Sequence, residues 1–217
     1  MSNAYGMSET SPISFQVRPT DSFEKQITTV GRVHPHIEAK IVDEQGNTLD
    51  IGETGEIYIK GYSVMQEYWN EPARTRKAIT PKGWVRSGDL GVIDQDGYLE
   101  IVGRIKDMII RGGENISPIE IESHLLTHPD IVDVQVFGVD SKSLGEDVMA
   151  YVILKDPNMI LTRTDIEKFC HSHISYHKIP RYIKLVRTFP LTETGKIKKN
   201  ELKAEANKIL HEVHPDL

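Results

Sequence analysis

The stretch GRIKDMIIRGGENISPIE (residues 103–120) decides the fold, because two different sequence patterns meet within it. Residues 107–116 predict a β-hairpin with a glycine-rich tip. Ser117-Pro118-Ile119-Glu120 then predicts the start of a helix. A serine can cap a helix, a proline suits its first position, and a glutamate three residues after the serine completes a capping box. We therefore predict two domains, residues 1–105 and 106–217.

Upstream of this stretch the pattern is one of strands and turns. Residues 1–30 are polar and are predicted to be irregular, whereas residues 31–104 are predicted to form a small β-rich subdomain. Apolar and polar residues alternate along its strands, as they do in strands with one buried face. The predicted elements are strands over 37–43 and 55–61, a short helix over 72–79, and a hairpin over 90–104 with Asp96-Gly97 in its turn.

Downstream of it, strands and helices alternate in a segment of ordinary domain size. A second capping box, from Thr164 to Glu167, predicts a helix that ends near residue 174. This order predicts a sheet covered by helices, so the fold class of the whole chain is α+β. The other predicted elements are helices over 118–128 and 198–210, and strands over 132–139, 148–155 and 182–189.

The bulk composition narrows the class of protein. Of the 217 residues 38% are hydrophobic, which is enough for a sizeable core, and the net charge of -6 argues against a nucleic-acid partner. A single cysteine, Cys170, cannot form an internal disulfide, so we expect a reducing, cytoplasmic compartment and a buried structural thiol. No apolar run reaches the ~18 residues that span a bilayer, so no transmembrane segment is expected.

Four polar segments are hard to explain by folding alone. Residues 5–10 combine a ring, a glycine, a hydroxyl and a carboxylate, which suit a base, a phosphate and a divalent cation. Asp89 follows a glycine turn and can accept both hydroxyls of a ribose, and the glycines within 103–115 let a backbone approach a ligand closely. Lys196, in the polar loop 190–197, can reach a phosphate or a carboxylate as a point charge. Each segment alone also fits a plain turn.

Taken in order, these segments resemble the adenylate-forming superfamily, which includes acyl-CoA synthetases, luciferases and the adenylation domains of peptide synthetases. The segments GEIYIKG (55–61) and VMQEYW (64–69) complete six motifs in the family order. The resemblance runs from Tyr5 to Lys196 and is strongest to medium-chain and related fatty-acyl-CoA synthetases. The runs that carry it are KGYSVMQEYWN, MIIRGGENI and HKIPRY.

The resemblance implies a two-step reaction with ATP, Mg2+ and coenzyme A. A carboxylic acid attacks the α-phosphate of ATP, giving acyl-AMP and pyrophosphate, and the thiol of coenzyme A then displaces AMP. Lys196 would be the catalytic lysine, bridging the carboxylate and the nucleotide. The other residues implied to bind nucleotide are Tyr5 beside adenine, Ser8 at the phosphate, and Asp89 with Arg104 at the ribose. Glu9 would help to hold magnesium.

The second domain would be a mobile C-terminal lid on this reading. Lys106 matches the hinge position of the family, about which the lid rotates between the two steps. Rotation would withdraw Lys196 and bring Arg111, Gly112 and Gly113 against the pantetheine of coenzyme A, where a glycine leaves room for the channel. The first domain would be the C-terminal part of the large AMP-binding domain.

Parts of the family pattern lie outside these residues. The glycine- and Ser/Thr-rich phosphate loop and most of the acyl pocket stand upstream of the Tyr-Gly motif in complete members. We therefore expect a fragment that is inactive alone. Two alternatives stay open: an adenylating enzyme with another acceptor, such as a carrier protein, and a non-catalytic binding module. The acyl chain length is not encoded in these motifs, and the family is compatible with a homo-oligomer.

A pair of histidines offers a competing site. His124 and His128 stand four residues apart on a predicted helix and could mimic a metal-binding pair. No glutamate lies between them and no third ligand is evident, so a structural pair is the interpretation that we favour.

Overall fold

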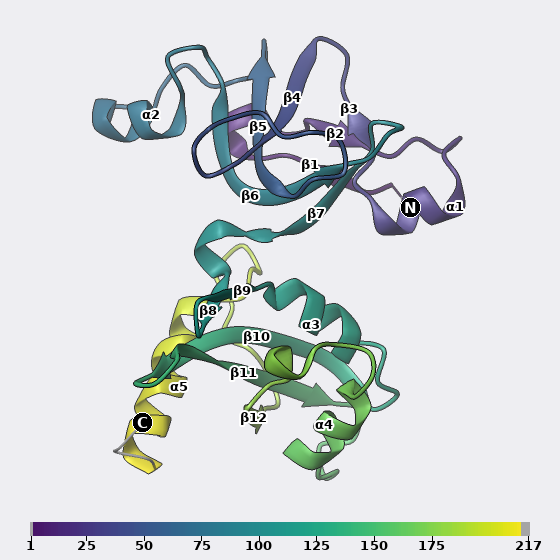
Figure 1. Cartoon of the computed structure of the whole chain (residues 1–217), viewed down its shortest axis with the longest axis vertical. Coiled ribbons are helices and arrows are strands. Elements are labelled where there is room, and N and C mark those ends of the chain that lie inside the picture. Colours follow the sequence, from purple (N-terminus) through teal and green to yellow (C-terminus); the bar gives the residue numbers. More distant parts are fainter. Residues whose placement is uncertain (1, 214–217) are drawn as a thin grey trace. The chain divides into compact units, whose positions relative to one another are not determined.

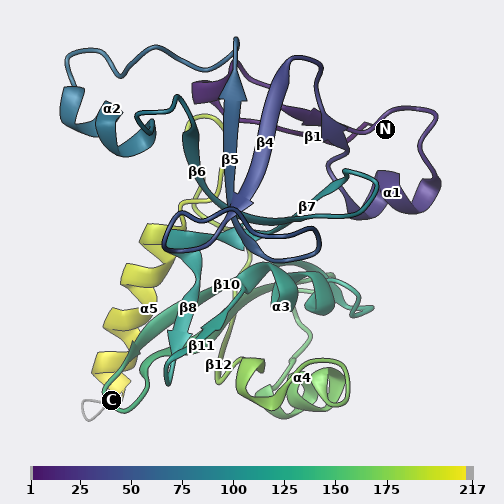
Figure 2. The same cartoon turned by 45° about the horizontal axis from the view of Figure 1, so that its top comes forward.

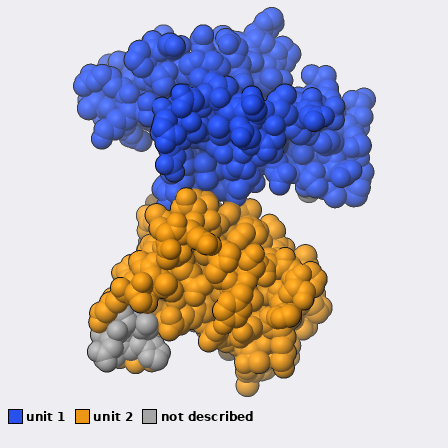
Figure 3. Space-filling view, viewed as in Figure 1, with its two compact units in different colours: residues 1–106 blue, residues 107–217 orange. Residues whose placement is uncertain are grey.

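A computed structural model describes residues 2–213 of the chain. The chain divides into two compact units, Met1–Lys106 and Asp107–Leu217, which are coloured separately in Figure 3. Each unit has buried hydrophobic residues of its own, one cluster in the first unit and two in the second. Figure 1 shows the helices and strands of both units. The division falls one residue from the boundary expected from the sequence.

The first unit is built from two antiparallel sheets. The larger has the order β4-β5-β6-β7, and its inner face carries isoleucines and a leucine in alternate positions, as the sequence pattern predicted. The short helix was also predicted. The strands are β4 (Ile37–Val42), β5 (Gly55–Gly61), β6 (Val85–Ile93) and β7 (Leu99–Arg104), and the helix is α2 (Pro72–Ala78).

The expectation that residues 1–30 are irregular is wrong in part. They contain two short strands and a helix, and with a third strand they form a sheet of order β1-β2-β3. Two-residue strands carry too little alternation to be recognised in a sequence. The elements are β1 (Ala4–Tyr5), the short 3-10 helix η1 (Ser8–Thr10), β2 (Phe15–Gln16), α1 (Phe23–Thr28) and β3 (Arg32–Val33).

The second unit is a five-stranded sheet with helices on both faces, which confirms the α+β class. Neighbouring strands follow the order β10-β11-β8-β9, and β12 pairs in parallel with β11. The strands are β8 (Ile109–Arg111), β9 (Glu114–Ile116), β10 (Ile131–Ser141), β11 (Gly145–Leu154) and β12 (Tyr182–Leu185). The helices are α3 (Pro118–Leu125), α4 (Arg163–Cys170), the 3-10 turn η3 (Tyr176–Lys178) and α5 (Lys199–Val213). The 3-10 turn η2 (Ile105–Asp107) spans the division between the two units.

The two faces of this sheet bury different partners. Val148, Ala150 and Val152 face the cluster that includes residues of α3 and α4. Met149 and Tyr151, which alternate with them, face the cluster that includes Leu202, Ala206 and Leu210 of α5. Figure 2 shows α5, in yellow, and α4, in light green, on different sides of the strands. Burial on both faces explains why β11 is a nearly continuous apolar run.

Helix caps differ from the prediction in two places. Helix α4 is capped by Thr162, whose hydroxyl and backbone form a reciprocal box with Asp165, so the box expected at Thr164 is wrong. The helix ends at Cys170 rather than near residue 174. At α3, Ser117 is the N-cap residue and Pro118 the first helical residue, but Glu120 accepts a hydrogen bond from Lys178 instead of closing a box. The third expected strand, over 182–189, ends at Leu185.

Candidate functional site

Asp89 is the centre of a polar cluster in the first unit. Its carboxylate is buried in β6, opposite Arg104 of β7. Oδ2 accepts a 2.8 Å hydrogen bond from the Tyr5 hydroxyl, and Oδ1 lies 2.7 Å from Arg104 Nε. Burial, and then the Asp89 carboxylate, raise the pKa of the Tyr5 hydroxyl, so Tyr5 stays a donor at neutral pH. Three residues assigned to the nucleotide from the sequence are therefore brought together.

The turn at Ser87-Gly88 aims this carboxylate. The Asp89 backbone N–H donates to Ser87 Oγ at 3.0 Å, and Gly88 takes a positive φ of 72° that favours glycine. The Gly88 N–H donates to Glu56 Oε1 at 3.0 Å, and burial raises the pKa of Glu56. Hydrogen bonds to Ser87 Oγ and to Glu56 Oε1 therefore hold the backbone of this turn.

Ser8 and Glu9 lie on η1, a short turn beside the first sheet. Glu9 accepts a 2.7 Å hydrogen bond from the Tyr68 hydroxyl through Oε1, and its carbonyl accepts from the Met65 N–H. Ser8 is exposed. A Cβ on Gly6 would lie 1.7 Å from the Pro12 carbonyl oxygen, so only glycine fits before this turn. Tyr68, which sequence reasoning did not single out, belongs to the YWN run and holds Glu9 in place.

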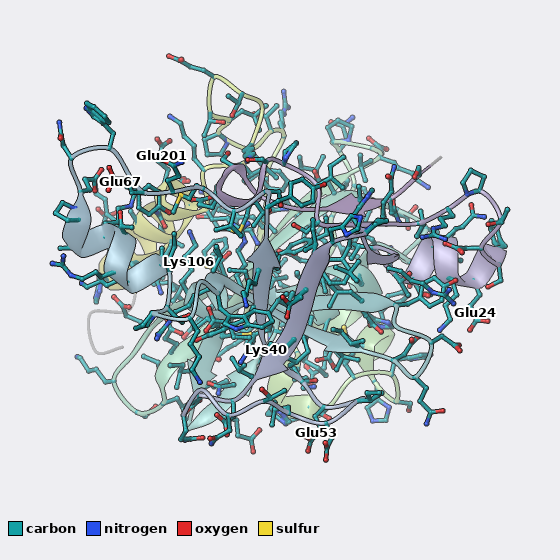
Figure 4. The ribbon with its side chains drawn as sticks, turned by 90° about the horizontal axis from the view of Figure 1, so that it is seen from above. Glu24, Lys40, Glu53, Glu67, Lys106 and Glu201 are labelled. Carbon is teal, nitrogen blue, oxygen red and sulfur yellow. The ribbon has the colours of Figure 1, made fainter. Side chains whose placement is uncertain are left out.

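Lys106 is the last residue of the first unit and lies in η2. Its side chain is exposed and is labelled in Figure 4. No ion pair to its side chain occurs within residues 2–213. The position that the resemblance assigned to a hinge thus adjoins the division between the compact units.

The glycine-rich hairpin is a two-residue turn between β8 and β9. Gly112 and Gly113 have φ angles of 60° and 89°, as a type I′ turn requires, and Arg111 pairs with Glu114 across it. A Cβ on Gly113 would meet no atom within 4 Å. The turn geometry alone therefore accounts for both glycines.

Arg111 is held by other residues of the second unit. Its Nε lies 2.8 Å from Asp147 Oδ1, and Nη1 donates to the His177 carbonyl at 2.6 Å. Asp147 is 0% exposed and also pairs with Arg181 Nη1 at 2.9 Å. Asp147 and Arg181 were missed in the sequence. The only available signal was an aspartate at a buried strand position in GEDVMAYV, since buried charges are nearly always paired.

Lys196 lies on a tight turn between Phe189 and α5. The Thr192 N–H donates to the Lys196 carbonyl at 2.7 Å, the Lys196 N–H donates to Thr192 Oγ1 at 3.0 Å, and Gly195 has a φ of 79°. Leu191 and Ile197 form a β-bridge at its base. The Lys196 side chain is exposed and has no ion pair with any carboxylate of residues 2–213. A defined backbone thus presents an uncompensated cation.

The two histidines pack against aromatic rings. His124 stacks on Phe169 and on His173, at centroid distances of 5.0 and 5.1 Å, and His128 meets Phe169 edge-on at 4.7 Å. No group of three or more His, Cys, Asp or Glu side chains that could hold a metal occurs in the described part of the chain. Cys170 is fully buried, as expected from the sequence, and burial raises its pKa to about 11.

Comparison with known proteins decides the family. Residues 1–69 match the family described as AMP-binding enzyme, and residues 120–196 match the family described as AMP-binding enzyme C-terminal domain. The chain belongs to the AMP-binding enzymes. Among residues 2–213 no helix of this family member is long and apolar enough to cross a membrane.

Curated AMP-binding relatives resemble the chain along nearly all of it. The mitochondrial medium-chain acyl-CoA ligase of Danio rerio is 47% identical over 95% of this chain and 34% of its own length. A putative acyl-CoA synthetase of Bacillus subtilis is 46% identical over 92% of this chain and 36% of its own length. The chain thus spans about a third of the length of these relatives.

Solved structures of AMP-binding enzymes have the same fold. ATP-bound MatB from Rhodopseudomonas palustris matches with a TM-score of 0.89 and 31% identity, over 96% of this chain and 41% of that one. The o-succinylbenzoate CoA synthetase of Bacillus subtilis, solved with an acyl-adenylate intermediate, matches with a TM-score of 0.83 and 32% identity, over 93% and 40%.

Proposed function

We propose that this chain carries the C-terminal part of the active site of an ATP-dependent fatty acid–CoA ligase. In the first step a carboxylate oxygen of the acid attacks the α-phosphorus of ATP, the α–β phosphoanhydride bond breaks, and pyrophosphate leaves. In the second step the sulfur of coenzyme A attacks the acyl carbon and AMP leaves. The observation that carries the proposal is Lys196, an unpaired cation on a rigid turn in the family's order of motifs.

Lys196 acts in the first step on this proposal. Two anions must approach each other, and negative charge builds on the oxygens of the α-phosphate as the new bond forms. A cation held at that point stabilises the transition state more than the separated substrates. The hydrogen bonds within the 192–196 turn fix the backbone from which the side chain extends, so little reorganisation is needed when substrate arrives.

Asp89 and its neighbours would hold the nucleotide. A carboxylate oxygen can accept more than one hydrogen bond, so Asp89 can receive ribose hydroxyls while Tyr5 keeps it oriented. Arg104, with 56% of its side chain exposed, can turn toward the ligand. Tyr5 would lie beside adenine and Ser8 near the phosphate.

Glu9 fits a magnesium site of the kind that Mg2+ uses beside nucleotides. Its Oε1 is bonded to Tyr68, which leaves Oε2 for a cation, and Mg2+ beside phosphates needs only one or two protein carboxylates. The ion would neutralise charge on the phosphates of ATP.

The second unit would receive coenzyme A beside the Gly112–Gly113 turn. A polar pocket of about 310 Å³ in this unit is lined by Arg111, Arg163, Arg181 and Tyr176, with Ile179 and one carboxylate, Glu167. Guanidinium groups suit phosphate oxygens in geometry and charge, and here the donors available are the N–H groups that are not already directed to Asp147, Glu167 or the His177 carbonyl. Lys106 would be the hinge about which the lid turns between the steps.

Measuring the two steps separately tests the proposal. We expect Lys196→Ala, in the complete product of the gene, to slow acid-dependent ATP–pyrophosphate exchange on the order of 100- to 1000-fold. Conversion of supplied acyl-AMP and coenzyme A to acyl-CoA should stay near its normal rate. Lys198→Ala is the matched control, because Lys198 stands two residues away and pairs with Glu201. Equal loss in both steps would overturn the role of Lys196.

One alternative acceptor has specific support. An amide bond synthetase from Marinactinospora thermotolerans matches this chain with a TM-score of 0.85 and 31% identity, so an amine could take the acyl group instead of coenzyme A. Acyl-AMP supplied with coenzyme A or with an amine separates the two functions, since only the correct acceptor releases AMP. The cytoplasmic location expected from the sequence stays a prediction.

A further inference from the structure

Helix α5, which follows the Lys196 turn, is fastened to the sheet by two similar polar ties. Lys199 Nζ lies 3.1 Å from Glu122 Oε1, and the same oxygen accepts a 2.8 Å hydrogen bond from the Val136 N–H. One helical turn later, Lys203 Nζ lies 2.5 Å from Glu146 Oε1. The other carboxylate oxygen of Glu146, Oε2, accepts a 2.9 Å hydrogen bond from the Ile110 N–H. In both ties one carboxylate joins a backbone N–H to a lysine of α5.

The two ties differ in their distance from Lys196. Lys199 is the first residue of α5 and stands three residues after Lys196, whereas Lys203 lies a full turn further along. Backbone hydrogen bonds hold the segment between Lys196 and Lys199. The Lys198 N–H donates to the Pro190 carbonyl, and the Lys199 N–H donates to the Ile197 carbonyl. Movement of the first turn of α5 is therefore passed directly to the base of the Lys196 turn.

Only a few contacts hold that base to the rest of the unit. The tip, residues 193–196, is exposed, and Ile197 packs partly buried against the cluster that contains Phe189. The Glu122–Lys199 tie joins the residue three positions after Lys196 to the rest of the unit, and the side chains of Lys199 and Glu122 are 33% and 15% exposed. A pair that is mostly shielded from solvent is screened less than a surface pair, so it can fix a position.

We propose that Glu122 is a positioning residue for Lys196. The proposal rests on the function given above, because position matters only if Lys196 must meet a reacting phosphate. Glu122 touches neither substrate nor the reacting atoms; it holds the first turn of α5 against β10 and so sets where the 192–196 turn projects. A misplacement of 1 Å can cost on the order of 100-fold in rate, so a smaller shift should cost about tenfold.

Amide hydrogen exchange in the 217-residue chain tests the mechanical half of the proposal. Glu122→Gln keeps an amide oxygen for the Val136 N–H but removes the charge that attracts Lys199. We expect the amides of Thr192, Lys196 and Lys198 to exchange about fivefold faster, the change that loss of one partly shielded ion pair produces. Glu146→Gln is the matched control, because it removes the same charge one turn further along and should leave these amides within about twofold of the wild type.

The half-reactions in the complete gene product test the functional half. Glu122→Gln and Lys199→Met should each slow acid-dependent ATP–pyrophosphate exchange about tenfold and leave acyl-CoA formation from supplied acyl-AMP unchanged. Lys199→Arg, which keeps a cation facing Glu122, should have the wild-type rate of ATP–pyrophosphate exchange. A role in stability alone would slow both half-reactions together and would not respond to this conservative replacement.

The outcomes separate the two proposals. If the amides of Thr192, Lys196 and Lys198 exchanged as fast in Glu146→Gln as in Glu122→Gln, the positioning role would be overturned. Any loosening of α5 would then be enough to speed their exchange. Amide hydrogen exchange in Glu122→Gln that matches the wild type would overturn the positioning role as well. A wild-type enzyme without acid-dependent ATP–pyrophosphate exchange would overturn the proposed function, whereas the amide measurements on the chain would still decide whether Glu122 holds the turn.

Discussion

Two aspartates in this molecule have almost the same surroundings, one in each unit. Asp89 is 5% exposed in β6, and Asp147 is 0% exposed in β11. Each lies within 3 Å of an arginine Nε, from Arg104 in one case and Arg111 in the other. Each also has a second donor, the Tyr5 hydroxyl for Asp89 and the Arg181 guanidinium for Asp147.

The difference lies in what covers the carboxylate. The Arg104 side chain is 56% exposed, whereas that of Arg111 is 18% exposed and its Nη1 donates a hydrogen bond to the His177 carbonyl. Arg104 is therefore the more accessible of the two arginines, whereas Arg111 is largely buried, and the exposed partner of Asp147 is Arg181, whose side chain is 41% exposed. A buried aspartate beside an arginine does not by itself mark a binding site, and the two sites differ in how exposed that arginine is.

The largest expected effect is on stability, from Asp147→Ala. It leaves Arg111 and Arg181 without the carboxylate that compensates them, and breaking such a buried pair costs about 3–5 kcal/mol. Urea unfolding of the chain measures the free energy. Asp89→Ala should cost less, about 1–3 kcal/mol, because Arg104 regains solvent. Equal losses for the two aspartates would break the comparison.

The next effect is a pH dependence of the Asp89 cluster, which comes from the Tyr5 hydroxyl. The folded pKa of Tyr5 is raised by burial and then by Asp89, so above the ordinary tyrosine pKa of about 10 the unfolded chain ionises Tyr5 and the folded chain does not. The stability that Tyr5 contributes is complete below pH 10 and falls as the pH rises. We expect about 1.4 kcal/mol to be lost by pH 11.

Tyr5→Phe isolates this contribution from the other tyrosines. The variant lacks the hydrogen bond to Asp89, so it should be about 1 kcal/mol less stable than the wild type at pH 8. Urea midpoints at pH 8, 10 and 11 should show the difference shrinking as the pH rises and reversing slightly at pH 11, because the expected loss of about 1.4 kcal/mol exceeds the hydrogen bond's contribution of about 1 kcal/mol. A difference that does not change with pH would mean that Tyr5 ionises equally in both states.

Local patterns in the sequence predicted most of the helices and strands. The strands predicted over 37–43 and 55–61 occur as Ile37–Val42 and Gly55–Gly61, because alternation and the turns that bound it are properties of neighbouring residues. The cap at Thr162 was missed because Thr162 and Thr164 each have an acidic residue three positions later, Asp165 and Glu167, so the local pattern fits either threonine. The shortest strands were missed because two residues make no pattern.

The site was predictable only as far as each motif is local. Tyr5, Asp89 and Arg104 were named singly, but their convergence on one carboxylate joins residues that lie far apart in the chain. Arg111 was named for coenzyme A from its motif, yet its Nε and Nη1 are directed to Asp147 and His177. A sequence motif identifies a position and not the partner that occupies its side chain.

The smallest expected effect separates the two arginines directly. Arg104→Met should lower the free energy of unfolding by less than about 1 kcal/mol, because a mostly exposed pair is screened and Tyr5 still satisfies Asp89. Arg111→Met should cost more, since it leaves a charge on the fully buried Asp147 with Arg181 alone. Urea unfolding of both variants under one condition makes the comparison. If Arg104→Met proves the more damaging of the two, then Arg104 is part of the frame of the first unit, and an incoming ribose could not take its place at Asp89.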